Sequence, residues 1–251
     1  MTIHPTAIIS PKAIIGANVQ IGAYSIIHDH VDIGANSQIG AFCEIGVSNH
    51  LSKQKRLMIG EGATIRSHSI FYEGSVFGAG LVTGHRVTVR EKVIAGKNLQ
   101  IGTLCDLQGH CSIGDYVRLH SNVHIGQHSV IGNFVWIFPY VVLTNDPHPP
   151  SDTLIGVTVK DFAAVATMSV LLPGAVIEEG CLVGASSTVK GKTEPHCIYV
   201  GNPAKNVGST SKIKLENGQP AYPWTSHFKR GYPKDITDQW ADSTTSNNYD
   251  I

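Results

Sequence analysis

Three histidines lie within the ten residues "LHSNVHIGQH", from Leu119 to His128, with Asn122 between the first two. A neutral imidazole can take a proton from a substrate or bind a zinc ion. Proton transfer needs one imidazole that faces the substrate, whereas zinc needs several ligands that converge on one point. The choice between these sites and a plain surface loop depends on where His120, His124 and His128 point, and therefore on the period of the chain.

The chain repeats with a period of six. Aliphatic residues, many followed by glycine, recur at this interval in three blocks, from Ile9 to Ile45, from Ile59 to Leu143 and from Val159 to Val189. Together they form about 28 hexapeptides. An amphipathic helix would repeat every 3.6 residues and a strand every two, so neither element alone explains the pattern. Hexapeptide periodicity is typical of a β-helix.

The composition excludes several classes of protein. The 251 residues carry 19 basic and 19 acidic side chains, so no net charge favours nucleic acid or a membrane surface. No apolar run approaches the roughly 18 residues of a membrane span, and the N-terminus does not resemble a signal peptide. Five cysteines without a CxxC pair indicate reduced, mostly buried thiols, and so a cytoplasmic protein.

The repeat resembles that of the hexapeptide-repeat acyltransferases, whose fold is a left-handed parallel β-helix with three hexapeptides in each triangular coil. The resemblance implies an all-β solenoid of about nine coils over residues 1–205. It also implies a homotrimer with sites in grooves between the coils of neighbouring subunits. The register slips near residues 47–56 and 144–157, which we expect to leave the solenoid as loops.

Residues 206–251 form a separate C-terminal extension that we expect to be irregular or short-helical. Its aromatic-rich segment "AYPWTSHFKRGYPKDITDQW" would cap the open end of the β-helix or meet a partner subunit. Its last ten or so residues are polar, and we expect them to be disordered.

The motif "YVGNPAK" ends the repeat and resembles a G-N-P-A-K/R element next to the CoA nucleotide in this family. Gly201 allows close backbone approach to a ligand, and Pro203 can begin a short helix whose N–H groups favour phosphate. The alternative is a plain exit of the chain from the solenoid. The predicted acetyl-CoA site consists of Ala166, Gly184, Lys190, Gly201, Asn202, Pro203 and Lys205.

Stacking the coils by 18 residues separates the histidines. His124 points outward and has Asp106 one coil before it, whereas His120 points outward with Gly102 before it and Phe138 after it. Coils stack at about 4.8 Å, so a pantetheine arm of roughly 20 Å crosses about four of them. Its thiol end therefore reaches the corner between the two histidines. The predicted catalytic residues are His120 and His124, as competing bases, with Asp106 and Asn122.

Two further segments resemble sugar-binding elements of the family. "TGHRVTVRE" is similar to a segment of sugar-modifying transferases and to an "IRE" element of UDP-N-acetylglucosamine acyltransferases, which implies that His85 and Arg90 line a sugar-nucleotide pocket. In that comparison the family's catalytic histidine falls on Ser121. The loop "LTNDPHPPSD" resembles acetyltransferase loops, unless it is only a rigid proline loop. The predicted substrate-binding residues are His85, Arg90, Gln108, Asn145, Asp146 and His148.

These patterns predict an acetyl-CoA-dependent N-acetyltransferase that acts on a UDP- or dTDP-linked amino sugar in bacterial surface glycan (lipopolysaccharide or O-antigen) biosynthesis, without a metal. A sugar O-acetyltransferase is the first alternative. A γ-class carbonic anhydrase shares this fold, but His110 and His128 stack only as a pair, and His85 plus two coils reaches Ser121. A non-enzymatic scaffold is the remaining alternative.

Overall fold

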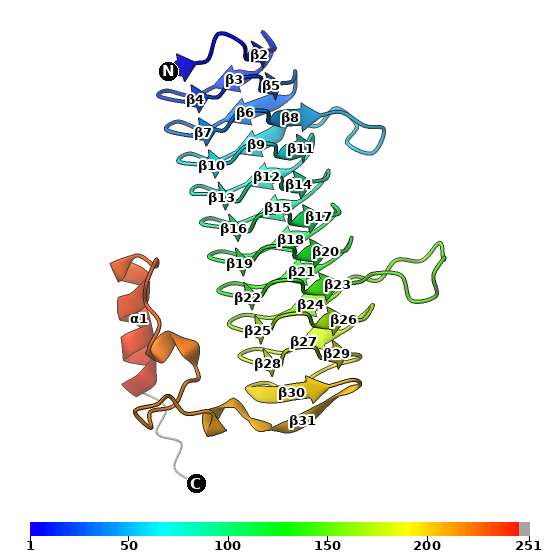
Figure 1. Cartoon of the computed structure of the whole chain (residues 1–251), viewed down its shortest axis with the longest axis vertical. Coiled ribbons are helices and arrows are strands. Elements are labelled where there is room, and N and C mark those ends of the chain that lie inside the picture. Colours follow the sequence, from blue (N-terminus) through cyan, green and yellow to red (C-terminus); the bar gives the residue numbers. More distant parts are fainter. Residues whose placement is uncertain (246–251) are drawn as a thin grey trace.

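The computed structural model describes residues 1–245, and their side chains up to residue 240. The chain winds into the predicted left-handed parallel β-helix, with three flat faces that each consist of one stack of short strands (Figure 1). Partners in neighbouring coils are parallel and in register, as in Arg118–Trp136 and Asp106–His124.

Face A contains twelve strands. They are β1 (Thr2–Ile3), β4 (Gln20–Ile21), β7 (Gln38–Ile39), β10 (Thr64–Ile65), β13 (Val82–Thr83), β16 (Gln100–Ile101), β19 (Arg118–Leu119), β22 (Trp136–Ile137), β25 (Ala164–Val165), β28 (Leu182–Val183), β30 (Cys197–Gly201) and the antiparallel β31 (Ala204–Ser209).

Face B contains ten strands. They are β2 (Ile8–Ile9), β5 (Ile26–Ile27), β8 (Glu44–Val47), β11 (Ile70–Tyr72), β14 (Thr88–Val89), β17 (Asp106–Leu107), β20 (His124–Ile125), β23 (Val142–Leu143), β26 (Val170–Leu171) and β29 (Thr188–Val189).

Face C contains nine strands. They are β3 (Ile14–Ile15), β6 (Val31–Ile33), β9 (Leu57–Ile59), β12 (Val76–Phe77), β15 (Ile94–Ala95), β18 (Ser112–Ile113), β21 (Val130–Ile131), β24 (Thr158–Val159) and β27 (Val176–Ile177). The helix therefore makes about eleven turns rather than nine. The difference arises because β1 and β30 lie outside the blocks of regular repeats and still pair with the sheet.

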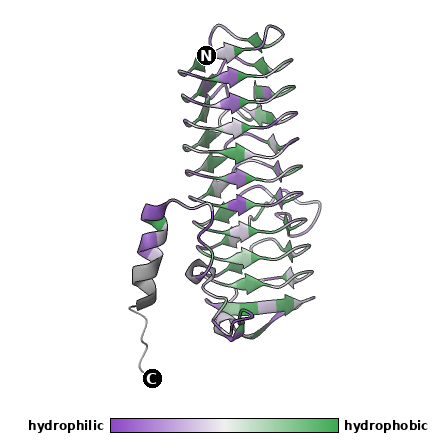
Figure 2. Ribbon diagram, turned by 60° about the vertical axis from the view of Figure 1, so that its left-hand side comes forward, coloured by the Kyte–Doolittle hydropathy of each residue, from purple (hydrophilic) through white to green (hydrophobic). Residues whose placement is uncertain are grey.

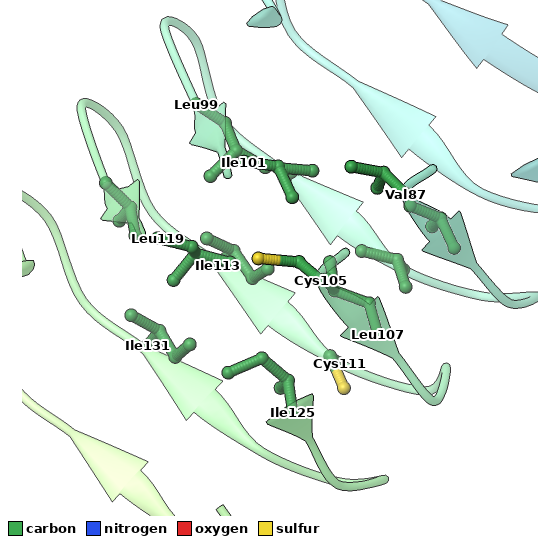
Figure 3. Packing of buried hydrophobic residues seen from close by; sticks show 14 of the residues in the cluster. Val87, Leu99, Ile101, Cys105, Leu107, Cys111, Ile113, Leu119, Ile125 and Ile131 are labelled. Carbon is green, nitrogen blue, oxygen red and sulfur yellow. The ribbon is translucent and has the colours of Figure 1, made fainter. Parts of the chain in front are cut away.

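The core is a narrow aliphatic stack. The last residue of most strands and the residue two positions before it point inward, as Val117 and Leu119 do. Figure 3 shows these side chains layered along the axis, with Cys105 and Cys111 among them. A solenoid of this kind gains its stability from contacts between neighbouring coils. The outward-pointing side chains are therefore not needed for the core and can serve as functional groups.

Both predicted loops are present. Residues 48–56 follow β8 and residues 144–157 follow β23, so both leave the corner between faces B and C and project to the same side (Figure 1). Buried carboxylates anchor the first loop, because Glu73 accepts from Ser52 Oγ at 2.8 Å and Glu91 accepts from Asn49 Nδ2 at 2.8 Å.

The C-terminal extension is irregular with one short helix, as expected. After the β30–β31 hairpin, which crosses the expected boundary at residue 205, it contains 3-10 turns η1 (Thr210–Lys212) and η2 (Trp224–Ser226) and helix α1 (Lys234–Thr245). The aromatic segment does not cap the open end but folds back along the side of the solenoid (Figure 2).

An outward aromatic column at the corner between faces C and A explains this docking. Phe134 stacks on Tyr116 at 5.2 Å and on Phe162 at 5.0 Å between ring centroids, and Trp224 and Trp240 pack against this column. Helix α1 extends to Thr245, and residues 246–251 of the segment for which we expect disorder lie outside the described part. No helix among the described residues is long and apolar enough to cross a membrane.

Candidate functional site

The two candidate bases lie on different faces. Leu119 ends β19 on face A and His124 begins β20 on face B, so the chain turns a corner between them. Asn122 forms that turn with a φ of 61°, a conformation that asparagine tolerates better than most residues. His120 remains on face A, so the two imidazoles flank one corner, as the sequence predicts, and line different cavities.

His124 and Asp106 form a dyad on face B. Their backbones pair across β17 and β20, and His124 Nδ1 lies 3.3 Å from Asp106 Oδ2. The side-chain amide of Gln108 donates a hydrogen bond to the same oxygen. Burial opposes ionisation of Asp106, but contacts with His124 and Gln108 outweigh it and lower the pKa of the carboxyl. Asp106 therefore stays ionised and orients the imidazole, and Nε2 of His124 makes no hydrogen bond with the described residues.

A cavity of about 640 Å³ adjoins the dyad. It is lined by His124, Val142 and Thr144, by Asn145–Pro149 of the second loop, by Leu172 and Pro173, and by Lys190. The sequence assigned Lys190 to CoA and His148 to the acceptor, and the structure brings both to the same cavity as His124. A cation in the same cavity as an imidazole base suits a substrate that carries negative charge.

Within the loop, Asp146 has a structural role. Its carboxylate accepts hydrogen bonds from His148 N at 3.0 Å, from Ser151 N at 3.0 Å and from Ser151 Oγ at 2.7 Å. The Ser151 hydroxyl is the main cause of its lowered pKa. Asn145 accepts from Ile155 N through its carbonyl oxygen at 2.7 Å. Asp146 therefore holds the loop in shape, and Asn145 and His148 keep side chains that can contact a ligand.

His120 has a different environment on face A. Its ring stacks on Phe138 at 4.8 Å and lies 5.8 Å from Trp136 between centroids. Burial, together with the charge of Arg118, lowers the pKa of His120, so this imidazole is neutral at pH 7. It lines a cavity of about 410 Å³ that is closed by the C-terminal extension.

The predicted sugar-nucleotide residues are dispersed. His85 lies at the corner between faces A and B, accepts or donates a hydrogen bond with Ser67 Oγ at 2.8 Å, and lines a cavity on face A. Arg90 lies on the face B side, where it pairs with buried Glu91. Gln108 donates a hydrogen bond to Asp106 of the dyad.

The predicted CoA residues also separate. Ala166 and Gly184 follow β25 and β28 on face A, whereas Lys190 follows β29 on face B. Gly201, Asn202, Pro203 and Lys205 are exposed at the β30–β31 hairpin. Pro203 does not begin a helix, because β31 pairs back onto β30 immediately after it. The motif thus offers a turn rather than a helix N-terminus to a phosphate.

No metal-binding group of three or more His, Cys, Asp or Glu side chains occurs within the described residues. His110 and His128 stack with ring centroids 5.4 Å apart, as the 18-residue spacing predicts. All five cysteines are free thiols, and four of them are buried.

Comparison with known proteins supports the fold and the family. The sequence model of the family described as "Bacterial transferase hexapeptide (six repeats)" matches residues 12–46. The acyl-[acyl-carrier-protein]–UDP-N-acetylglucosamine O-acyltransferase of Pseudomonas savastanoi pv. phaseolicola is 31% identical over 209 residues, which cover 81% of this chain and 72% of that enzyme. The chain therefore belongs to the hexapeptide-repeat acyltransferase family.

Other relatives match over less of their length. The enzyme of the same name from Saccharophagus degradans is 32% identical over 143 residues, 52% of this chain and 48% of its own. Gamma carbonic anhydrase 2 of Arabidopsis thaliana is 27% identical over 166 residues, 63% of this chain and 55% of its own. The chain thus spans about half the length of these two relatives.

A solved structure supports the fold. The UDP-N-acetylglucosamine acyltransferase of Arabidopsis has a TM-score of 0.71 at 19% identity, with 82% of this chain and 74% of that chain covered.

The sequence reasoning missed the cavity around His120. Its walls come from Trp136 and Phe138 on face A and from Tyr222, Trp224 and Phe228 of the extension. A signal was present, because Tyr116 and Phe134 are aromatic residues at outward positions 18 residues apart. An exposed apolar column of this kind favours burial against another segment, and the extension contains two of the three tryptophans of the chain.

Proposed function

We propose that the protein transfers an acetyl group from acetyl-CoA to the amino group of a UDP- or dTDP-linked amino sugar. The observation that carries this proposal is the His124–Asp106 dyad beside a cavity that a loop and Lys190 complete. An oriented imidazole with a free Nε2 is the group that acyl transfer to an amine requires. The family of the chain supports acyl transfer as the reaction class.

In the proposed reaction, the acceptor nitrogen attacks the thioester carbonyl carbon. His124 Nε2 takes the proton that the nitrogen loses as the C–N bond forms. The C–S bond then breaks, and the thiolate of CoA leaves and recovers that proton from the imidazolium. Asp106 stabilises the imidazolium while the proton resides on His124. Asn122 lies at the corner between the faces and remains a proposed contact for the oxyanion.

The donor would lie toward the C-terminal end of the solenoid. Lys190, which lines the same cavity as His124, and exposed Lys205, in the hairpin, would attract the phosphates of CoA. Ala166, Gly184 and Gly201 would allow the pantetheine arm to approach the backbone. The loop residues Asn145 and His148 would contact the acceptor.

A second candidate is O-acylation of a sugar nucleotide. The relatives favour it, since these acyl-[acyl-carrier-protein]–UDP-N-acetylglucosamine O-acyltransferases act on UDP-N-acetylglucosamine with an acyl-[acyl-carrier-protein] donor. The same dyad would then deprotonate a hydroxyl group. A hydroxyl is a weaker nucleophile than a free amine, so this reaction would depend more strongly on the base.

A carbonic anhydrase function is favoured only by the similarity to the Arabidopsis protein. Zinc would require ligands from more than the His110–His128 pair, for example from a neighbouring subunit. Metal analysis of the purified protein, together with a CO₂ hydration assay, tests this alternative directly.

We also propose a homotrimer that works in the cytoplasm in surface glycan synthesis. Face C carries a row of exposed apolar side chains, with Met58 at 48%, Ile94 at 62% and Val130 at 47% exposed, which suits burial against a second copy. Five free thiols suit a reducing compartment. Sedimentation equilibrium would test the trimer.

The proposed activity is tested by thiol release from acetyl-CoA with a panel of UDP- and dTDP-amino sugars and the corresponding hydroxyl sugars. His124→Gln should lower kcat by about 10²- to 10⁴-fold, the contribution of a general base. His128→Gln is the matched control, because His128 lies outside the cavity and should leave kcat unchanged. Equal turnover of His124→Gln and the native protein would exclude the dyad as the catalytic base.

A further inference from the structure

Face A carries two adjoining cavities that the dyad on face B does not use. The first, of about 410 Å³, is the cavity between face A and the extension. The second, of about 460 Å³, continues along face A toward the N-terminus. They share His120, Trp136, Phe228 and Arg230, and therefore form one continuous groove, which we call the A groove.

Aromatic rings form one end of the A groove. His120 and Phe138 are stacked with an angle of only 10° between their planes, and Phe228 meets Trp136 edge-on at 5.3 Å. These rings are held in place by the extension, since Trp136 also packs on Trp224. Rigid, parallel aromatic faces favour a planar ring as a ligand over a flexible chain.

Polar groups at this end lack protein partners. Among the described residues, the imidazole nitrogens of His120 and the hydroxyl of Tyr222 have no hydrogen-bond partner, although burial raises the pKa of Tyr222 and lowers that of His120. A half-buried donor or acceptor without a partner gains most from a ligand that satisfies it. A ring with carbonyl and N–H groups would do so.

Positive charge runs from the part that the two cavities share, at Arg230, along the second cavity. Arg66, Arg118 and Arg230 line the A groove, and none of the described residues that line either cavity is an aspartate or glutamate. Arg118 is occupied by Gln100, Gly231 and Tyr232, whereas Arg230 is exposed and makes no hydrogen bond or ion pair within the described part of the chain. Arginine side chains without a carboxylate partner suit phosphate groups.

From this arrangement we propose that the A groove binds a nucleoside diphosphate, with its base among the aromatic rings and its phosphates at Arg230 and Arg66. The inference rests on the proposed function for the identity of the substrate that carries the nucleotide. His120 and His124 are four residues apart, so their Cα atoms are separated by at most about 14 Å. The aromatic end of the A groove therefore lies one corner away from the dyad.

Tryptophan fluorescence reports on this groove directly. The chain has three tryptophans, of which Trp136 and Trp224 line the cavity and Trp240 packs against Trp224. A base that stacks in the A groove should quench their emission. Titrations with UDP, dTDP and CoA, supported by calorimetry, distinguish the nucleotide of the acceptor from that of the donor, and either result supports the site. Uridine and pyrophosphate alone should bind more weakly than UDP.

Two variants with matched controls locate the ligand. Arg230→Gln removes a charge-assisted hydrogen bond and should raise Kd about tenfold, whereas Lys229→Gln, at an exposed neighbour outside the groove, should not. Phe138→Leu removes a stacking face and should raise Kd about five- to tenfold, whereas Tyr140→Leu, exposed at the next corner, should not.

Native affinity in both Arg230→Gln and Phe138→Leu would overturn the proposal, as would the absence of quenching by all three nucleotides. Equal quenching by an acyl thioester that lacks a nucleotide, such as octanoyl-N-acetylcysteamine, would also overturn it. Binding is measured without turnover, so nucleotide binding without acetyl transfer would exclude the proposed activity and leave the A groove as a nucleotide site.

Discussion

Trp224 is the residue on which the docking of the extension depends most. It is 7% exposed, and its ring contacts Trp136, Phe162, Tyr232 and Trp240. Its indole N–H donates to the carbonyl oxygen of Phe162 at 3.1 Å. Replacement by alanine removes the centre of this cluster and leaves that carbonyl without its partner.

The expected loss follows from these contacts. Truncation of a buried tryptophan to alanine costs about 3–5 kcal/mol, and loss of the hydrogen bond costs about 1 kcal/mol more. A change of about 4–6 kcal/mol corresponds to at least a roughly thousandfold rise in the population of the undocked extension. The β-helix should stay folded, because its coils are stabilised by their own neighbours.

Hydrogen exchange separates the two parts. In Trp224→Ala, amides of α1 should exchange about a thousandfold faster than in the native protein. They should lose all protection if the free energy of docking is smaller than the free energy that the substitution removes. Amides of β16 and β19 should keep their native exchange rates. Tyr140→Ala, at a side chain that is 56% exposed, is the control and should change neither. Native protection of α1, or equal acceleration in the β-strands, would refute the reasoning.

Three further outcomes are expected. Gly102→Ala should lower the free energy of unfolding, measured by chemical denaturation, by about 1–3 kcal/mol, because the new Cβ would lie 2.4 Å from the backbone at His120. In the control Gly62→Ala, the Cβ meets no atom within 4 Å and adds only the strain of a positive φ. Equal losses of stability in the two variants would contradict the steric argument. Burial lowers the pKa of His120 in the folded state, so its contribution to stability is present above its unfolded pKa, about 6.5, and is lost as the pH falls through the folded value. The variant His120→Phe should therefore flatten this part of the profile of stability against pH. An unchanged profile would exclude that contribution. Burial raises the pKa of Cys105 to about 11, so iodoacetamide at pH 8 should label the more exposed Cys197 before Cys105. Mass spectrometry of the labelled peptides measures the order, and labelling of Cys105 first would contradict the prediction.

Local alternation explains why the sequence predicts the solenoid so well. A side chain such as Leu119 points inward because its neighbours in the strand point outward, and this depends only on spacing. The register then places residues that are 18 apart in adjacent coils, which is how the Asp106–His124 contact follows from the sequence. The same counting locates both loops, since a solenoid expels residues that break the period.

Several features depend on contacts that no period describes. The loop decides that Lys190 and His148 meet at one cavity. The return of the extension to face A depends on pairs distant in sequence, such as Trp136 Nε1 and the Tyr232 hydroxyl at 3.1 Å.

The sequence by itself therefore determined the β-helix, the direction of each side chain and the Asp106–His124 pair, because these follow from a repeat that acts over one or two coils. Only the tertiary structure decided where the extension docks and that it encloses a cavity with His120. Those outcomes depend on packing between segments about a hundred residues apart, such as Trp136 and Tyr232, for which the period carries no information.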